Sequence, residues 1–329
     1  MALAGHAFEQ AFKQAGLTGS IGKRTGVCAG TTVASQLNDI GFYSRYRNGT
    51  TESYDAVHRY LAGNPAEALK REYGLEGPAM TVVNACSSGT DAVGTAMAWL
   101  RSGRCDAVIA GGSDELNRVP LAGFNSLGIL SDSPCRPFDR DRDGLNLGEG
   151  AAFLVLETLS SAKARGAAPL AECRSYATAS DAYHLTAPRP DGLGLETAVT
   201  KALDRAGIFG DRIDFINAHG TGTQTNDRTE GLVFGHLFGK TVQIYSTKGY
   251  TGHTLGAAGA IEAVLTVLSL QRQWLPQSRG YAEFDETVGI RPVEKKREIE
   301  AEYAMSASLA FGGMNSVLIF KRCDNEGDR

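Results

Sequence analysis

Short apolar runs alternate with helical patterns along most of this chain, and that alternation limits the fold more than any other sequence feature. The runs at 25–30, 79–84 and 105–112 are rich in small and β-branched residues and predict buried strands. A helix is predicted over 92–100 and a further strand over 151–157. Strands separated by helices in this way are typical of α/β proteins, in which helices cover the faces of a sheet.

The second half of the chain repeats this rhythm. Strands are predicted at 213–218, 242–246, 303–308 and 315–321, and helices at 196–206, 227–238 and 257–272. No proline-rich or serine-rich linker separates the two halves of the sequence. We therefore expect an α/β protein made of two related units, residues 1–157 and 158–329, that pack as one body.

Charge and hydropathy argue against several classes of protein. The 329 residues carry a formal net charge of −4 at pH 7, which disfavours a broad nucleic-acid-binding surface. The sequence opens without a signal-peptide pattern and contains no apolar run of membrane-spanning length, so a cytoplasmic protein is expected. The six cysteines include no CxxC pair and none lies at zinc-finger spacing from a histidine, so no metal site is predicted.

Cys86 is the one cysteine whose surroundings suggest chemistry. It lies in Asn84-Ala-Cys-Ser-Ser-Gly89, between a predicted buried strand and the start of a helix that Ser87 and Ser88 are expected to cap. Backbone N–H groups and the dipole at a helix start favour an anion, so we expect a lowered thiol pKa and a nucleophilic thiolate. The alternative is a buried structural cysteine, which is common for this residue type.

Two histidines stand in segments rich in glycine and threonine that follow predicted strands. His219 lies in Asn217-Ala-His-Gly-Thr-Gly-Thr223, and His253 lies in the segment 246–262. A lone histidine is usually a satisfied core or surface residue. Open α/β sheets, however, collect their functional groups at strand ends, and this favours a functional role for both.

At these motifs the sequence resembles the β-ketoacyl synthase branch of the thiolase superfamily, and the resemblance runs from about residue 20 to residue 321. The segments 137–144, 147–150 and 180–188 resemble segments of the family, and the matching motifs occur in the family's order. They contain Cys86 in Ala-Cys-Ser-Ser-Gly, His219 in Ala-His-Gly-Thr-Gly-Thr, Lys248 and His253 in Thr-Lys-x-x-x-Gly-His, Glu262 in Gly-Ala-Ala-Gly-x-x-Glu, and Phe311-Gly-Gly with Asn315. The resemblance implies a thiolase-like, layered αβαβα fold built from two related halves.

The resemblance also implies an acyltransferase that forms carbon–carbon bonds, a 3-oxoacyl-[acyl-carrier-protein] synthase. Cys86 would accept an acyl group from the phosphopantetheine arm of an acyl carrier protein, and a decarboxylating malonyl group on a second carrier would supply the attacking carbon. His219 and His253 would stabilise the enolate by hydrogen bonding. The backbone N–H groups of Cys86 and Phe311 would hold the oxyanion, and Phe311 with Gly312 would form the loop that closes the site.

Four supporting residues have two interpretations each. Lys248 and Glu262 would form an ion pair that orients the histidines, and a plain buried salt bridge is nearly as good an interpretation. Thr221 and Thr223 would bind the amides of pantetheine, or they would serve only as turn hydroxyls.

The resemblance sets the expected partners as well. No bound cofactor is expected, because the substrates arrive on the phosphopantetheine of a carrier protein. The second expected partner is another synthase subunit, in a homodimer or a heterodimer. Neither nucleic acid nor a membrane is expected. Whether the pathway makes fatty acids or polyketides, and which acyl length is used, stays open.

The chain departs from the family in two places. The family opens with a strand that we expect in the middle of the first sheet, whereas this chain begins with a helical pattern over 7–16. In the closing loop, Leu309 and Ala310 stand where Phe and Gly are usual, and Met314 stands where Thr is usual. Ala310 would stiffen the loop and Met314 would add bulk, so the hypothesis is an altered acyl-chain preference or slower gating.

Two alternatives come from other functional classes. One is a catalytically impaired partner subunit of the chain-length-factor type. Such subunits usually lack the cysteine, so Cys86 together with His219 and His253 argues against it. The other is a thiolase or a synthase primed by coenzyme A, which would replace one of the two histidine motifs.

Overall fold

Four strands form the first sheet of the protein. The computed structural model describes most of the chain, namely residues 1–17, 24–32, 40–62 and 64–323. The strands lie in the order β2-β1-β3-β4 and comprise β1 (Thr25–Gly30), β2 (Ala79–Val82), β3 (Ala107–Asp114) and β4 (Gly150–Glu157). β1 is parallel to β2 and β3, and β4 is antiparallel to β3. Every residue of β1 is buried, as expected for a parallel strand covered on both faces.

Five strands form the second sheet, in the order β5-β11-β10-β6-β7. They are β5 (Ala171–Ser180), β6 (Phe215–Asn217), β7 (Gln243–Tyr245), β10 (Tyr303–Ala310) and β11 (Met314–Arg322). β6 is parallel to β7 and β10, whereas β11 is antiparallel to both β10 and β5. A small antiparallel pair, β8 (Trp274–Leu275) and β9 (Arg297–Glu298), lies outside this sheet.

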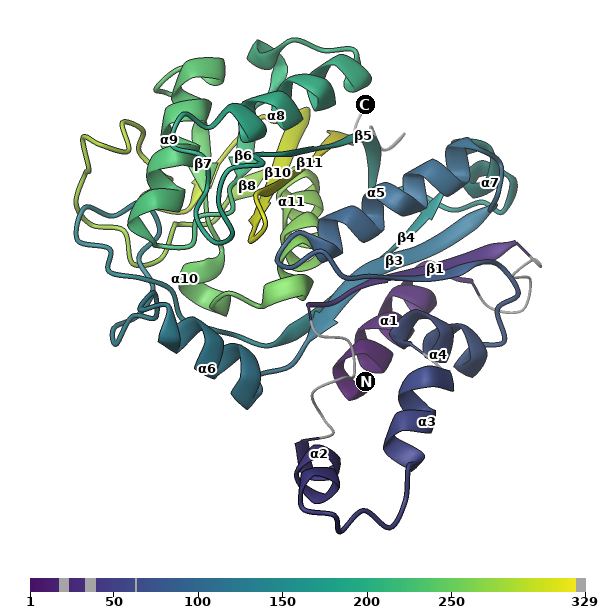
Figure 1. Cartoon of the computed structure of the whole chain (residues 1–329). Helices are drawn as coiled ribbons and strands as arrows, with labels where there is room; N and C mark the ends of the chain where they lie inside the picture. Colours follow the sequence, from purple (N-terminus) through teal and green to yellow (C-terminus); the bar gives the residue numbers. More distant parts are fainter. Residues whose placement is uncertain (18–23, 33–39, 63, 324–329) are drawn as a thin grey trace.

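Helices cover the outer faces of both sheets and fill the space between them (Figure 1). On the first sheet the outer helices are α1 (Ala2–Gln14) and α4 (Pro65–Glu72), and on the second they are α8 (Leu193–Ala206) and α9 (Gln224–Phe238). The helices between the sheets are α5 (Ser88–Arg101) and α11 (Ala258–Arg272). The other helices are α2 (Ile40–Arg47), α3 (Asp55–Ala62), α6 (Arg118–Ser126), α7 (Leu159–Ala164) and α10 (Lys248–Thr251). This αβαβα layering confirms the predicted fold class.

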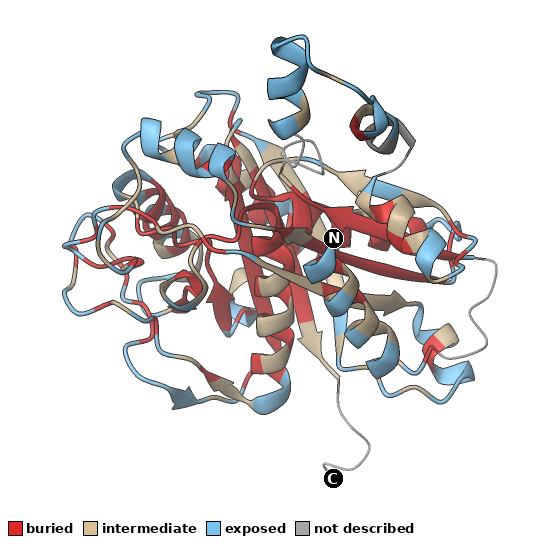
Figure 2. Cartoon of the chain, turned by 90° about the horizontal axis from the view of Figure 1, so that it is seen from below, coloured by how far each residue is buried: buried red, intermediate tan, exposed pale blue. Residues whose placement is uncertain are grey.

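Three apolar cores lie between these five layers, and the buried residues gather in the sheets and the helices between them (Figure 2). Adjacent strand residues point to opposite faces of a sheet. On β1, Cys28 therefore faces the central core, while Val27 and Ala29 face α1 and α4. Phe8 of α1 packs edge-on against Phe153 of β4, with ring centroids 5.4 Å apart.

The expectation that the first sheet lacks a central strand is wrong. β1 and β3 are direct neighbours from the pair Thr25–Ala107 to the pair Gly30–Gly112. By strand direction, β2-β1-β3-β4 corresponds to β7-β6-β10-β11 of the second sheet, where β5 adds a fifth strand beyond β11. No described residue pairs with β4 on that side. The position without a counterpart is therefore at the edge beyond β4, because β5 occupies the matching place in the second sheet.

Two further observations concern the chain as a whole. The structure contains strand β5, which the sequence patterns did not predict. Across the described ranges, no helix combines the length and the apolarity needed to cross a membrane.

Candidate active site

Cys86 lies in a strained turn between β2 and α5. The preceding residue, Ala85, has a φ of +48°, a left-handed conformation that non-glycine residues rarely adopt. The hydroxyl of Ser88 accepts a hydrogen bond from the Asn84 N–H and donates one to the Ala85 carbonyl. The predicted capping role is wrong for Ser87, which makes no side-chain cap hydrogen bond, because both serines bind within the turn instead. These contacts hold a conformation that the backbone alone would not favour.

The sulfur of Cys86 is almost completely enclosed, with 4% of the residue exposed. Burial raises the pKa of Cys86 to about 12, because it disfavours the charged thiolate. The charge of Lys248 and the backbone N–H of Phe311 act in the opposite direction and are outweighed. The lowered thiol pKa expected from the helix start is therefore not found, and the resting cysteine is a neutral thiol.

His219 follows β6 and is fixed by Lys248. The Nζ atom of Lys248 lies 3.2 Å from Nδ1 of His219 and donates to the His219 carbonyl over 2.6 Å. An ammonium group can only donate, so Nδ1 accepts and the ring proton sits on Nε2. Burial, the charge of Lys248 and His253 hold the pKa of His219 well below its ordinary value. The ring is therefore a neutral imidazole whose Nε2–H is available as a donor.

His253 stands next to His219, between α10 and the start of α11. The two rings are 5.2 Å apart and nearly perpendicular, at 86°. Burial and the charge of Lys248 hold the pKa of His253 well below its ordinary value, so this ring is neutral as well. Its Nδ1 atom has no hydrogen-bond partner within the described structure. The sequence places these histidines 34 positions apart along the chain, and the fold brings them together.

Lys248 and Glu262 form a buried ion pair behind the histidines. Their side chains are 1% and 2% exposed, and Nζ of Lys248 donates to Oε1 of Glu262. Burial raises the pKa of Glu262, and the charge of Lys248 opposes that shift. Because Lys248 also contacts His219, the pair reaches one histidine ring directly.

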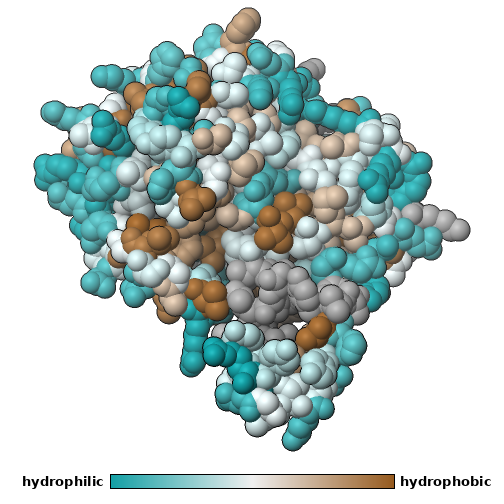
Figure 3. Space-filling model, viewed as in Figure 1, coloured by the Kyte–Doolittle hydropathy of each residue, from teal (hydrophilic) through white to brown (hydrophobic). Residues whose placement is uncertain are grey.

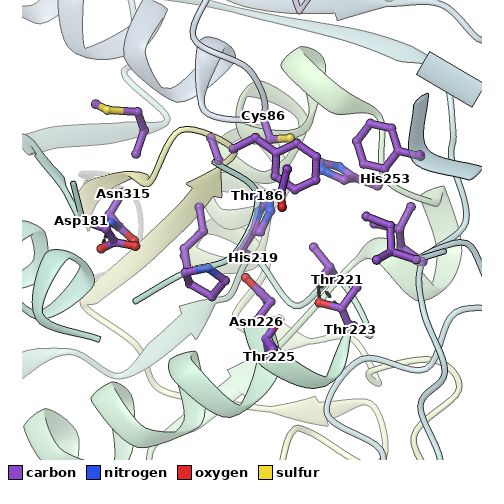
Figure 4. A pocket seen from close by; sticks show the side chains of 18 residues that line it. Cys86, Asp181, Thr186, His219, Thr221, Thr223, Thr225, Asn226, His253 and Asn315 are labelled. Atoms are coloured by element: carbon purple, nitrogen blue, oxygen red, sulfur yellow. Dashed lines mark hydrogen bonds between the residues drawn. The ribbon is translucent and has the colours of Figure 1, made fainter. Parts of the chain in front are cut away.

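One pocket collects most of the predicted site residues (Figure 4). Those that line it are Cys86, His219, His253, Thr221, Thr223 and Phe311. Lys248 and Glu262 do not line it, and neither does Gly312. The pocket wall also includes Asp181 and Thr186, from the family-like segment 180–188, and Phe124 and Asn226, which no motif had singled out. Phe124 lies on α6 and Asn226 lies in the first turn of α9, where the sequence carries no recognised motif.

The two predicted pantetheine contacts are neighbours on the wall of this pocket. The hydroxyls of Thr221 and Thr223 lie 2.9 Å apart and hydrogen-bond to each other (Figure 4). Each hydroxyl oxygen also has further hydrogen-bonding capacity. The pair is therefore compatible with both interpretations of these residues.

The turn between β10 and β11 closes the pocket beside the cysteine. Phe311 stacks on Phe124, with ring centroids 5.3 Å apart and planes at 17°. Gly312 has a φ of +86°, and its N–H donates to the Leu185 carbonyl over 2.7 Å. Leu309, Ala310 and Met314, where the chain departs from its family, all line the pocket. Substitutions at those three positions therefore reshape the wall itself.

Two family models match the chain in succession. The model described as "Beta-ketoacyl synthase, N-terminal domain" matches residues 1–162, and "Beta-ketoacyl synthase, C-terminal domain" matches residues 170–282. The chain belongs to the β-ketoacyl synthase family. The 3-oxoacyl-[acyl-carrier-protein] synthase 2 of Staphylococcus aureus is 40% identical to this chain over 261 residues. That match covers 76% of this chain and 63% of the Staphylococcus protein.

Solved structures of other ketosynthases share the fold over nearly the whole chain. The ishigamide ketosynthase/chain length factor superposes with a TM-score of 0.90 at 33% identity, covering 98% of this chain and 83% of the other. A type II polyketide ketosynthase in complex with its acyl-carrier protein also gives 0.90, at 28% identity, covering 97% and 83%. These matches confirm the thiolase-like fold implied by the sequence motifs.

Proposed function

We propose that this chain is a 3-oxoacyl-[acyl-carrier-protein] synthase. The proposal is carried by one arrangement: the Cys86 thiol, the Phe311 N–H and the neutral rings of His219 and His253 converge on one pocket. The first half of the chain would supply the nucleophile, and the second half would supply both histidines. The chain spans 63% of the length of its Staphylococcus relative, and the activity of the whole protein is part of this proposal.

The first half-reaction would be acyl transfer. The sulfur of Cys86 attacks the thioester carbonyl on the carrier's phosphopantetheine arm, and the pantetheine thiol leaves with the proton that Cys86 gives up. Because Cys86 rests as a neutral thiol, its proton leaves as the acyl group arrives. The N–H of Phe311, whose backbone already acts to lower the pKa of the Cys86 thiol, and the N–H of Cys86 would stabilise the oxyanion.

The second half-reaction would be decarboxylative condensation. The malonyl carboxylate leaves as carbon dioxide, and the electron pair stays on the thioester as an enolate. Nε2–H of His219 donates to the enolate oxygen, and His253 supplies the second donor. The enolate carbon then attacks the acyl-Cys86 thioester, and the Cys86 thiolate leaves and takes up a proton.

The remaining residues would position these groups. Lys248 holds the tautomer of His219, and Glu262 balances the charge of Lys248. Thr221 and Thr223 would bind the pantetheine amides with their free hydrogen-bonding capacity. The chain would need no resident cofactor, because the carrier protein delivers both substrates.

The proposal includes two protein partners, an acyl carrier protein and a second synthase-like subunit. Ketosynthases of the same fold are described with a carrier protein and with a chain length factor. A hydrophobic surface on and around α6 supports the second partner, because Leu116, Val119, Leu121 and Leu127 are each more than 40% exposed there. Apolar side chains are visible on this side of the molecule (Figure 3). Light scattering of the purified chain, with Leu121→Lys as the test variant, would show whether this surface binds a second copy.

A cytoplasmic location is also part of the proposal. Cys28, Cys86, Cys105, Cys135 and Cys173 are free thiols, in keeping with a reducing compartment.

Mass spectrometry after incubation with an acyl-loaded carrier protein tests the function directly. We expect an acyl adduct on Cys86, none in Cys86→Ala, and a 3-oxoacyl product after malonyl carrier protein is added. A folded protein that takes no acyl group on Cys86 would instead support the chain-length-factor type of partner subunit.

A further inference from the structure

We propose that Asp91 is a positioning residue that holds the Cys86 turn against the second sheet. The inference rests on the proposed function for the role of Cys86 as nucleophile. Asp91 lies in the first turn of α5, is 6% exposed and does not line the pocket. It therefore acts on the reaction only through the residues that it binds.

One oxygen of Asp91 binds the turn that carries the nucleophile. Oδ2 accepts a hydrogen bond from Nδ2 of Asn84 over 2.6 Å and another from Oγ of Ser87 over 2.8 Å. These two residues flank Ala85 and Cys86 on either side. Ala85 is the residue in the left-handed conformation, so the turn needs contacts that hold it. Asp91 supplies two of them from a single oxygen.

The other oxygen of Asp91 binds the second sheet. Oδ1 accepts hydrogen bonds from the Tyr176 hydroxyl over 2.9 Å and from Oγ of Ser316 over 2.5 Å. Tyr176 lies on β5 and Ser316 lies on β11. A charged carboxylate that receives four hydrogen bonds is a strong link, since bonds to ionised groups are about twice as strong as neutral ones.

The contact with Tyr176 depends on a glycine in α5. A Cβ atom at Gly94, three residues after Asp91, would lie 2.4 Å from the Tyr176 ring. Glycine in the middle of a helix is unfavourable, so a packing reason is needed for it. Gly94 lets the ring lie against the helix backbone, and this brings the Tyr176 hydroxyl to Oδ1 of Asp91.

The link matters because the site is assembled from both sheets. Ser316 follows Met314 and Asn315 on β11, and both of these line the pocket. Phe311, whose backbone acts to lower the pKa of Cys86 and which lines the pocket with it, lies in the turn that precedes this strand. The Asp91 carboxylate therefore fixes the distance between the turn that carries Cys86 and β11, the strand that follows the proposed oxyanion donor Phe311.

Asp91→Asn tests this inference, because the amide replaces one acceptor oxygen by a donor. We expect single-turnover acyl transfer to Cys86 to fall at least about tenfold, since displacing a reacting group by about 1 Å can cost about 100-fold. Malonyl decarboxylation, which depends on the histidines, should stay within about twofold of the parent. Glu157→Gln is the matched control: Glu157 is also an enclosed carboxylate with several hydrogen bonds, and it binds Arg165 away from the pocket.

Three outcomes would overturn the proposal. Asp91→Asn could leave acyl transfer unchanged, or it could slow acyl transfer and decarboxylation equally. The third is a selective loss of acyl transfer in Glu157→Gln. If Asp91→Asn does not fold, the double variant Tyr176→Phe/Ser316→Ala removes only the donors from the second sheet. It should show the same selective loss, and parent-like acyl transfer in this variant would overturn the proposal.

A readout that needs no substrate separates this inference from the proposed function. The rate of Cys86 alkylation by iodoacetamide should fall in Asp91→Asn, because the thiolate loses the Phe311 N–H. A parent protein that takes no acyl group would refute the proposed function, while a slower alkylation would still support the role of Asp91. Unchanged alkylation would refute that role.

Discussion

The Nζ atom of Lys248 lies 3.2 Å from Nδ1 of His219 and sets the position of the proton on that ring. A lysine ammonium has no acceptor, so His219 presents Nε2–H to the pocket. Burial, and after it the charge of the same lysine, lower the pKa of both histidines. One buried cation thus helps burial to keep two neighbouring rings neutral and orients one of them, and Glu262 balances its charge.

Replacing His219 by Ala should slow malonyl decarboxylation by about 100- to 1000-fold, because one preorganised donor to the enolate is lost. Acyl transfer to Cys86 should continue, since that step develops no enolate. Carbon dioxide release and acyl-enzyme mass report the two steps separately. His236→Ala, at a largely exposed side chain on α9, is the control and should match the parent. Equal losses in both half-reactions would contradict the assigned role.

Lys248→Met should destabilise the fold by about 3–5 kcal/mol, because the buried carboxylate of Glu262 is left without its counter-charge. Urea unfolding measures this loss. The double variant Lys248→Met/Glu262→Gln should recover part of the stability, because the charge that had lost its partner is removed as well. If single and double variants unfold at the same urea concentration, the pair does not act as described.

The two neutral histidines predict a pH dependence of folding. Their pKa values are held well below the ordinary value of 6.5, so the unfolded chain binds more protons than the folded chain below pH 6.5. The two histidines do not affect the free energy of unfolding above pH 6.5. They decrease it as the pH falls from 6.5 toward the lowered pKa values. Urea unfolding as a function of pH should show that His219→Gln/His253→Gln loses less stability than the parent as the pH falls below 6.5. An unchanged slope would contradict the prediction.

Gly94→Ala should destabilise the protein, because the new methyl group would lie 2.4 Å from the Tyr176 ring. Overpacking of this kind costs about 1–3 kcal/mol. Gly123 on α6 provides a control in another helix, since a Cβ there meets nothing within 4 Å. Gly123→Ala should therefore stabilise by about 0.4–1 kcal/mol. Thermal or urea unfolding distinguishes the two, and equal effects would refute the packing argument.

The closing loop should control the preferred acyl length. Leu309, Ala310 and Met314 line the pocket, so their side chains are in reach of an acyl chain on Cys86. Leu309→Phe/Ala310→Gly should change the ratio between the acyl-transfer rates that are measured with short and with long acyl chains on the carrier protein. A variant with the rates of the parent at every length would rule this out.

The sequence predicted the repeating scaffold well, because local pattern determines it. The strand expected at 25–30 is β1, and the helix expected at 257–272 is α11 with a short 3₁₀ turn before it. β5 was missed because its sequence, Ala-Glu-Cys-Arg-Ser-Tyr-Ala-Thr-Ala-Ser, is polar and small. It becomes a strand through its pairing with β11, which is a tertiary effect that sequence pattern does not report.

The candidate site also has features that the sequence predicts and features that depend on tertiary structure. Motifs predicted Cys86, His219 and His253, and the structure brings them into one pocket. The lowered thiol pKa was wrong because the enclosure of the sulfur depends on segments far away in the sequence. No motif singled out Asp91, and only its partners Tyr176 and Ser316 reveal the link to the second sheet.

The sulfur of Cys86 and the N–H of Phe311 reach the same point from different sheets. Their separation therefore depends on how the two sheets are aligned. A remote substitution, a bound ligand or a neighbouring subunit that slides one sheet along the other would move these two groups apart. The reactivity of a single thiol can thus serve as a sensor of the packing across the entire central layer.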